Sequence, residues 1–267
     1  MKNMKNWLTE QVSINTEQWD RSLVTFYPEA KKWMCDPISY SNHLTVTCNY
    51  LNAVKLIDWD NYLNDNSTIL DIGCGGGWLT AYLSNKSKIK KIIALDSSEN
   101  YLQNFLPKVV SHLNGNLSKV ETIQALFTPV LLDANSVDMI VISSALHHAD
   151  NINFVLSEFE RVLKPGGYLI ILNETPNQNF KYLYHISSAF LKILYKSLFK
   201  KHERFSQKIS LMGFLYDPYL GDVDFPIWYW EKSIKEAKFQ LVQVLDTKLQ
   251  TVVKTKGRSL KHFICKK

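Results

Sequence analysis

Short apolar runs alternate with amphipathic stretches through the middle of the chain. Residues 151–163 repeat apolar side chains at helical spacing, and the Pro165-Gly166-Gly167 turn that follows cannot continue a helix. We expect strands at the runs TILDI (68–72), KIIAL (91–95), VETIQ (120–124), VDMIVIS (137–143) and YLIILN (168–173). Strands that are apolar on both faces and separated by helices predict a parallel sheet covered on both sides.

The flanking segments follow different patterns. Residues 20–64 lack strand alternation and predict two or three helices before the sheet, and residues 177–226 are too long for a plain loop. A helix at 228–238 and strands at 239–247 and 259–266 complete the pattern. The short link between these last two strands predicts an antiparallel pair.

The predicted fold class is α/β. We expect a doubly wound, mostly parallel, seven-stranded Rossmann-like sheet that ends in an antiparallel hairpin. Helices precede the sheet, and a helical insertion follows its fifth strand. The expected segments are an N-terminal helical segment covering a pocket (1–64), an α/β core (65–176), a helical and aromatic insertion (177–227), and a C-terminal helix with the antiparallel strands (228–267).

Composition indicates an ordinary globular protein. Of the 267 residues, 46% are hydrophobic, and 31 lysines and arginines against 25 acids give a net charge of +6. A solvated basic face is the simpler interpretation of this mild excess, and a partner carrying phosphate or anionic lipid is the alternative. The cysteines form no C-x-x-C pair, which favours a reducing compartment. The N-terminus lacks the apolar core of a signal peptide and no run reaches the length of a spanning helix, so we expect a cytoplasmic protein.

The stretch DIGCGGGWLT (71–80) holds four of the chain's 10 glycines. It lies between a predicted strand and a helix, where such folds bring their backbone close to a ligand. The dinucleotide-binding spacing G-x-G-x-x-G fails, because Trp78 stands at the sixth position counted from Gly73. The spacing is instead D-x-G-x-G-x-G, beginning at Asp71.

The stretch ILDIGCGGGWLT resembles the first motif of the class I S-adenosylmethionine (SAM)-dependent methyltransferases, and the resemblance spans roughly residues 67–175. VDMIVISSALHHADN and EFERVLKPGGYLIILNETP are similar to the later pattern of the broad small-molecule group in that family. The resemblance implies SAM as cofactor, S-adenosylhomocysteine as product and no metal. It makes residues 65–176 the SAM-binding core.

SAM carries an ammonium, a carboxylate, a ribose diol and an adenine. Asp71 can interact with the ammonium, and Asp96, about 20 residues beyond the loop, can accept both ribose hydroxyls. A helix N-cap is the alternative role of Asp96, although Ser97 or Ser98 can fill it. Relatives often have an aspartate near the adenine amine, where this chain has Gln124. The expected cofactor residues are Asp71, Gly73, Cys74, Gly75, Gly77, Asp96, Ser97, Gln124, Ala125 and Ser143.

Methyl transfer from a sulfonium is an in-line displacement, which orientation and exclusion of water accelerate without an obligatory catalytic residue. A general base matters when the acceptor is a hydroxyl or a protonated amine. His147 and His148 follow the fourth strand, and either is a candidate base, with local packing or capping as the alternative. Glu174 is a candidate for orienting the acceptor, with a solvated strand end as its alternative. No histidine, cysteine and aspartate set has metal-ligand spacing.

Aromatic density in residues 177–227 predicts a lid over an apolar or aromatic acceptor, and packing against the N-terminal helices is the alternative. Residues 182–200 predict an amphipathic helix. That helix is interpreted as a roof over the pocket, as an interfacial helix at a membrane or lipid-tailed substrate, or as a contact for a partner helix. The expected substrate contacts are Tyr27, Tyr40, His43, Tyr216 and Trp228.

The sequence therefore predicts a biosynthetic methyltransferase that acts on an oxygen or nitrogen of a small or medium-sized metabolite. An RNA or lipid-linked acceptor is one alternative, but no Asn/Asp-Pro-Pro-aromatic motif for base amines follows the fourth strand. A NAD-dependent oxidoreductase is contradicted by Trp78, and a non-catalytic partner subunit with this fold is the alternative from a different class. The expected partner is a small-molecule acceptor, and peripheral contact with a membrane is an alternative. Nucleic acid is disfavoured, and the oligomeric state is left open.

Overall fold

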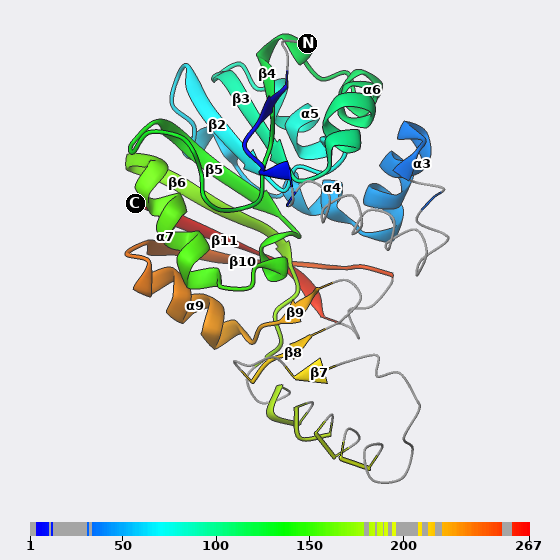
Figure 1. The fold of residues 1–267 in the computed structure, drawn as a ribbon, viewed down its shortest axis with the longest axis vertical. Helices are drawn as coiled ribbons and strands as arrows, with labels where there is room; N and C mark the ends of the chain where they lie inside the picture. Colours follow the sequence, from blue (N-terminus) through cyan, green and yellow to red (C-terminus); the bar gives the residue numbers. More distant parts are fainter. Residues whose placement is uncertain are drawn as a thin grey trace.

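The computed structural model has a main sheet of eight strands in the order β1-β4-β3-β2-β5-β6-β11-β10 (Figure 1). The strands are β1 (Lys5–Asn6), β2 (Ser67–Ile72), β3 (Ile89–Asp96), β4 (Val120–Gln124), β5 (Val137–Ser143), β6 (Leu163–Glu174), β10 (Gln240–Gln250) and β11 (Ser259–Lys266). Neighbours from β1 to β6 run parallel, and β11 runs antiparallel to both β6 and β10. The predicted fold class is confirmed.

The structure describes residues 4–10, 12, 31, 34–178, 182–184, 186–188, 190, 191, 194, 195, 208, 209, 213–216, 221–252 and 258–267, with the backbone alone at 208 and 209. Within these residues, the helices are α3 (Pro37–Asn42), α4 (Tyr50–Val54), α5 (Trp78–Ser84), α6 (Leu106–His112), α7 (Ile152–Val162) and α9 (Ile227–Glu236). Short π- or 3₁₀-helical turns lie at His43–Thr47, Trp59–Asn61, Tyr101–Phe105, Leu117–Lys119 and Leu146–His148.

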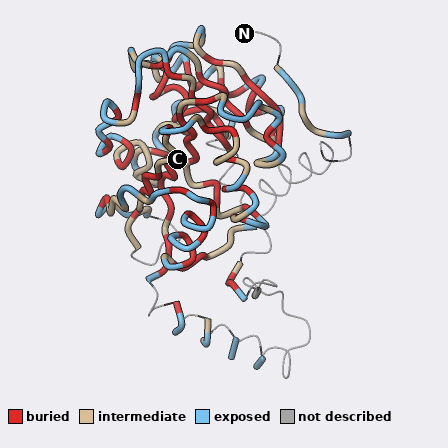
Figure 2. The backbone as a smooth tube through the Cα atoms, turned by 90° about the vertical axis from the view of Figure 1, so that its left-hand side faces the viewer, coloured by how far each residue is buried: buried red, intermediate tan, exposed pale blue. Residues whose placement is uncertain are grey.

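Helices cover both faces of the sheet because its strands present apolar side chains to both sides. In β2, Leu70 and Ile72 pack in one hydrophobic cluster with α7 and α9. Ile69 points to the other face and packs in a second cluster with residues of α4 and α5. Buried residues consequently run through the centre of the molecule (Figure 2). Polar side chains are left mainly at the ends of the strands.

The strand β1 was not expected from the sequence. Its two polar residues pair through the backbone with the edge strand β4, Lys5 opposite Ile123 and Asn6 opposite Gln124. The Lys5 side chain forms an ion pair with Glu121. A two-residue strand that contributes no apolar side chain leaves no period-two pattern to recognise.

The turn expected at Pro165–Gly167 after α7 forms the first part of strand β6. Asn151 begins α7 by accepting a hydrogen bond from Phe154 N at 3.1 Å, which satisfies a backbone donor of the first turn. The helix ends at Val162, and β6 starts at once. Between the pairs Val137–Leu163 and Met139–Tyr168 the register shifts, and Gly166 adopts a φ of 77°. The proline–glycine segment thus forms an irregular entry to the strand.

The insertion contains a small sheet in addition to helical residues. Strands β7 (Lys208–Ile209), β8 (Leu215–Tyr216) and β9 (Val223–Asp224) pair antiparallel. The described helical residues between 182 and 195 extend away from the main sheet (Figures 1 and 2). Apolar side chains expected on one face of this helix are exposed, Leu183 by 65% and Phe190 by 57%. Among the described residues, no helix is long and apolar enough to cross a membrane.

The stacking of Trp230 on Phe263 fixes α9 to β11. The two rings lie 5.6 Å apart at an angle of 19°, and Trp230 is 1% exposed. We expect Trp230→Ala to lower the free energy of unfolding by about 3–5 kcal/mol, because it opens a cavity in the core. Urea denaturation measures the change. Trp228→Ala is the matched control: this tryptophan of the same helix is 42% exposed, so its loss should cost about 1 kcal/mol or less. Equal losses of stability in the two variants would refute the role of the Trp230–Phe263 contact in holding α9 on β11.

Candidate active site

The glycine loop between β2 and α5 is held in a conformation and a space that require glycine. Gly73, Gly75 and Gly77 have φ values of 63°, 50° and 80°. A Cβ on Gly73 would lie 2.9 Å from Ala145 Cβ, and a Cβ on Gly76 would lie 2.8 Å from the ring of Tyr40. The loop is therefore packed between the N-terminal helices and the segment that follows β5. It stands where the strand order reverses between β2 and β5, which is where open α/β sheets bind ligands.

Asp96, at the carboxyl end of β3, anchors this loop. Its Oδ2 accepts a hydrogen bond from Gly75 N at 2.7 Å, and its Oδ1 accepts one from Ser98 N at 2.9 Å. Ser98 Oγ accepts from Tyr101 N at 3.3 Å and so caps the next helical turn. The carboxylate of Asp96 thus lies beside the glycine loop.

The other expected cofactor residues join the same strand ends. Gln124 Nε2 donates to the carbonyl of Ser97 at 3.1 Å, and Ala125 N donates to the carbonyl of Asp96 at 2.9 Å. Cys74 is 4% exposed, and its backbone N donates to Leu95 O at 3.0 Å. Cys74 therefore supports the loop through its backbone.

Asp71 lies beneath the loop rather than on its surface. It is 1% exposed, and its Oδ2 accepts a hydrogen bond from Thr80 Oγ1 at 2.6 Å. Burial raises the pKa of Asp71 to about 7, and the neighbouring carboxylate of Asp96 adds to the effect. Thr80, in the first turns of α5, is a partner that the sequence reading did not include.

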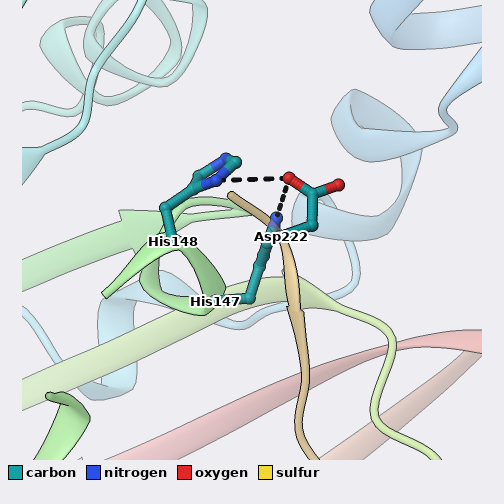
Figure 3. Close-up of side chains that lie close together, drawn as sticks. All are labelled: His147, His148 and Asp222. Carbon is teal, nitrogen blue, oxygen red and sulfur yellow. Dashed lines mark ion pairs between the residues drawn. The ribbon is translucent and has the colours of Figure 1, made fainter. Parts of the chain in front are cut away.

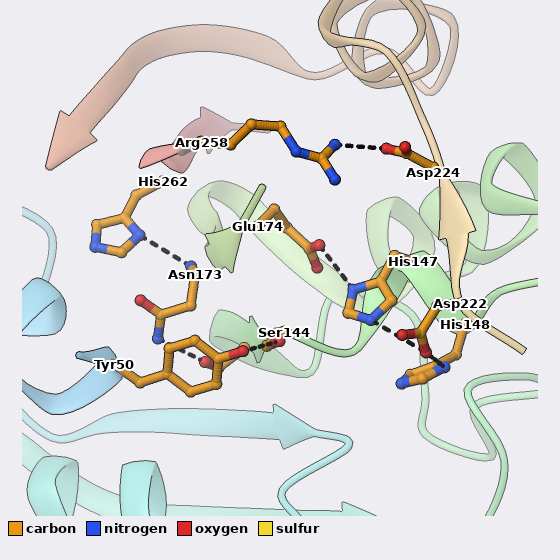
Figure 4. Close-up of polar contacts among 11 residues, drawn as sticks. Tyr50, Ser144, His147, His148, Asn173, Glu174, Asp222, Asp224, Arg258 and His262 are labelled. Atoms are coloured by element: carbon orange, nitrogen blue, oxygen red, sulfur yellow. Dashed lines mark hydrogen bonds and ion pairs between the residues drawn. The ribbon is translucent and has the colours of Figure 1, made fainter. Parts of the chain in front are cut away.

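His147, His148 and Glu174 come together at the ends of β5 and β6 (Figure 4). His147 Nδ1 lies 2.8 Å from Glu174 Oε2 and donates to it, since a carboxylate only accepts. On the other side, His147 Nε2 lies 3.8 Å and His148 Nδ1 lies 3.2 Å from Asp222 Oδ1. Figure 3 shows the Asp222 carboxylate reaching both imidazole rings. Four residues from three segments therefore form one polar cluster.

The protonation of His147 depends on opposing effects. Burial disfavours the charged imidazole, but the carboxylates of Glu174, Asp222 and Asp224 outweigh it and raise the pKa of His147 to about 9. The Nδ1 hydrogen bond to Glu174 acts in the same direction. Without a bound ion His147 is therefore the charged imidazolium at neutral pH, and a metal ion at Nε2 would replace one of its two protons.

A second group of hydrogen-bonded residues adjoins this cluster. Asn173 Nδ2 donates to Ser143 Oγ at 2.9 Å, and Asn173 N donates to His262 Nδ1 at 3.1 Å (Figure 4). Tyr50 Oη and Ser144 Oγ lie 2.7 Å apart. Asn173 Oδ1 and Glu174 Oε1 are buried without a hydrogen-bond partner among the described residues.

The expected substrate contacts are spread over several places. Tyr27 lies outside the described residues. Tyr40 packs on the glycine loop, His43 Nε2 lies 3.2 Å from Cys48 Sγ, and Tyr216 belongs to β8. The partly exposed Trp228 has its ring 6.4 Å from that of Phe214. Their contact with an acceptor stays a prediction.

Asp222, Tyr50 and His262 are the residues of this region that sequence reasoning missed. Asp222 lies in the insertion, far along the chain from both histidines. The stretch GDVD (221–224) around it is typical of a loop. Tyr50 and His262 reach the site from α4 and β11. No short motif joins these residues, so only the three-dimensional fold reveals the cluster.

Known proteins share this fold and loop. Residues 70–171 match the family described as "Methyltransferase domain". A solved SAM-dependent methyltransferase from Aquifex aeolicus aligns with 90% of this chain and 97% of its own, with a TM-score of 0.55 and 20% identity. The fold is thus that of the class I methyltransferases. The match to the methyltransferase domain family thus covers the segment that contains the glycine loop and both histidines.

Two curated relatives are each similar to about half of this chain. A demethylmenaquinone methyltransferase from Bacillus licheniformis is 30% identical over 138 residues, which cover 51% of this chain and 57% of that protein. One from Staphylococcus carnosus is 31% identical over 139 residues, which cover 51% of this chain and 55% of that protein. The chain thus spans little more than half the length of these relatives.

The buried position of Asp71 predicts a pH-dependent stability. Its pKa in the folded state, about 7, lies above the ordinary value of 3.8. The unfolded chain therefore releases the proton first, and stability is lost as the pH rises from about 4 to about 7. The side chain of Asp71→Asn cannot ionise, so this variant does not lose stability in the same way. Over this pH range, its free energy of unfolding should rise relative to that of the wild type by on the order of 4 kcal/mol.

Urea denaturation at a series of pH values measures the difference between the two proteins. Asp60→Asn is the control, because the Asp60 side chain is 70% exposed. A wild type and an Asp71→Asn variant with parallel stability profiles would contradict the pKa of Asp71.

Proposed function

We propose that the protein transfers the methyl group of SAM to an oxygen or nitrogen of a small or medium-sized metabolite with apolar or aromatic character. One observation carries the proposal: the glycine loop with Asp96 and the His147–Glu174 pair lie on opposite sides of the switch point in one sheet. A cofactor at the loop would face an acceptor at the pair.

The cofactor side has chemistry suited to SAM. Asp96 offers carboxylate oxygens at the distance along the chain that ribose recognition requires. The glycines at 73, 75 and 77 let the backbone approach the ligand closely. Asp71 supplies a carboxylate beneath the loop, and a ligand ammonium would favour its ionised form.

The transfer itself requires alignment. The lone pair of the acceptor forms a bond to the methyl carbon while the carbon–sulfur bond breaks, and the sulfonium leaves as a neutral thioether. The proton of the acceptor passes to a carboxylate oxygen of Glu174 or to water. Glu174 Oε1 is buried without a partner among the described residues and can accept a hydrogen bond from the acceptor, which orients it for in-line attack.

The names of the curated relatives support an apolar acceptor that contains a ring system. Both are named for demethylmenaquinone, a quinone, and their similarity covers about half of this chain. The insertion sequence differs from a plain loop in its aromatic content, but Phe214, Phe225 and Tyr229 are buried in the main hydrophobic cluster. The partly exposed Tyr216 and Trp228 are the better candidates to contact an aromatic ring.

Removal of the Asp96 carboxylate tests cofactor binding. We expect Asp96→Ala to weaken S-adenosylhomocysteine binding at least about 10-fold, since two charge-assisted hydrogen bonds to the ribose are lost. Calorimetric titration measures the affinity. Asp138→Ala is the matched control, because Asp138 lies near the start of β5, at the end of the parallel strands that is remote from the glycine loop. If Asp96→Ala bound S-adenosylhomocysteine as tightly as the wild type does, the proposed contact of Asp96 with the ribose would be wrong.

Labelled SAM tests the class of acceptor. The protein is incubated with methyl-labelled SAM and a lysate of its source organism, and the products are separated into RNA, protein, lipid and small-molecule fractions. We expect label in low-mass, organic-soluble product, and none with Asp96→Ala. Label confined to RNA or protein would overturn the proposed acceptor class, and no transfer at all would favour a non-catalytic partner subunit.

A further inference from the structure

Two histidines and one aspartate converge at the acceptor side of the site (Figure 3). The rings of His147 and His148 lie with their centroids 4.4 Å apart. Asp222 Oδ1 lies 3.8 Å from His147 Nε2 and 3.2 Å from His148 Nδ1. One ligand atom from each of the three residues lies within 4.8 Å of the other two.

These separations fit ligands of a single ion. Bonds from Zn²⁺ to imidazole nitrogen and carboxylate oxygen are about 2.0–2.2 Å long, so two ligand atoms of one ion lie about 3–4 Å apart. The distances from Asp222 Oδ1 to both imidazoles fall in this range. Only small side-chain movements would therefore bring all three atoms to bonding distance.

Glu174 orients His147 in the way that metal-binding histidines are oriented. Such histidines donate their other ring N–H to a carboxylate, which fixes the tautomer and directs the free nitrogen at the metal. His147 Nδ1 makes this contact with Glu174 Oε2 at 2.8 Å, so Nε2 faces Asp222. Glu174 is 2% exposed and comes from the rigid end of β6.

The charges around the cluster also favour a cation. Glu174 and Asp222 supply two carboxylates, whereas Asp224 pairs with Arg258 at 2.7 Å. Among the described residues, Asp222 forms ion pairs with the two histidines alone. The three side chains are 20%, 30% and 35% exposed, so an ion can reach them and keep open coordination positions.

We propose that His147, His148 and Asp222 bind one divalent transition-metal ion, with Glu174 as the positioning residue. Two imidazoles and one carboxylate suit ions such as Zn²⁺, Fe²⁺ or Ni²⁺, whereas Mg²⁺ and Ca²⁺ prefer oxygen ligands throughout. Spacing along the chain gave no sign of the site, because its third ligand comes from the insertion.

The use of this ion rests on the proposed function. An ion at the acceptor side would hold an acceptor hydroxyl on an open coordination position and lower its pKa, so that the hydroxyl releases its proton to water and attacks the methyl group as an oxyanion. Binding of the ion does not depend on methyl transfer, and the two can be tested separately.

Titration of the metal-free protein with Co²⁺ and Zn²⁺ tests the site. We expect one ion per chain and a visible Co²⁺ spectrum without the near-ultraviolet band of sulfur ligands. Asp222→Asn and His148→Ala should each weaken Zn²⁺ binding by more than about 100-fold, and Glu174→Gln by about 10-fold. His112→Ala, which removes an exposed histidine of α6, should bind as the wild type does.

Circular dichroism shows that each variant is folded, and S-adenosylhomocysteine binding is measured in the same preparations. The metal site is refuted if the wild type binds no Co²⁺ with nitrogen and oxygen ligands, or if folded Asp222→Asn and His148→Ala bind Zn²⁺ as tightly as it does. Loss of the metal site with intact S-adenosylhomocysteine binding would leave the proposed function standing. Failure of the wild type to bind S-adenosylhomocysteine would contradict that function instead.

Discussion

Burial of the main sheet on both faces is the constraint on which the site depends. Leu70 and Ile72 face one layer of helices and Ile69 faces the other, so a polar side chain within a strand needs a hydrogen-bond partner, as Asp71 has in Thr80. Polar side chains that could contact a ligand lie where the strands end. Because the strands from β2 to β6 run parallel, their carboxyl ends lie on one side of the sheet, and the glycine loop and the histidine cluster both lie there.

Close packing makes the glycine loop a joint between three parts of the chain. Tyr40 from α3 packs on Gly76, Ala145 from the segment after β5 lies against Gly73, and Asp96 binds Gly75. A ligand that moves the loop must therefore move against the N-terminal helices and the segment that leads to the histidines. The glycine loop and the start of the segment that carries the histidines are thus in direct contact.

Local sequence patterns were sufficient for the fold and for the position of the glycine loop. Alternation of apolar runs and helical stretches gave the seven long strands, and the spacing from Asp71 to Gly77 gave the loop, because each is a property of neighbouring residues. Asp222 could not be found in this way, since its partner histidines lie far from it in the sequence. The strand β1 and the sheet β7–β9 were also missed, because two-residue strands carry too little pattern.

The division of the site between sheet and insertion has a consequence for specificity. His147 and Glu174 come from strand ends, whereas Asp222 comes from the insertion. The strand β9, which directly follows Asp222, is held in place by side-chain bonds. Asp224 in β9 accepts from Asn177 Nδ2 at 2.6 Å and from Arg258 Nη1 at 2.7 Å. These bonds place Asp222 against the histidines without involving the glycine loop. Changes in the insertion can therefore alter the charge beside the two histidines without removing a contact of the glycine loop.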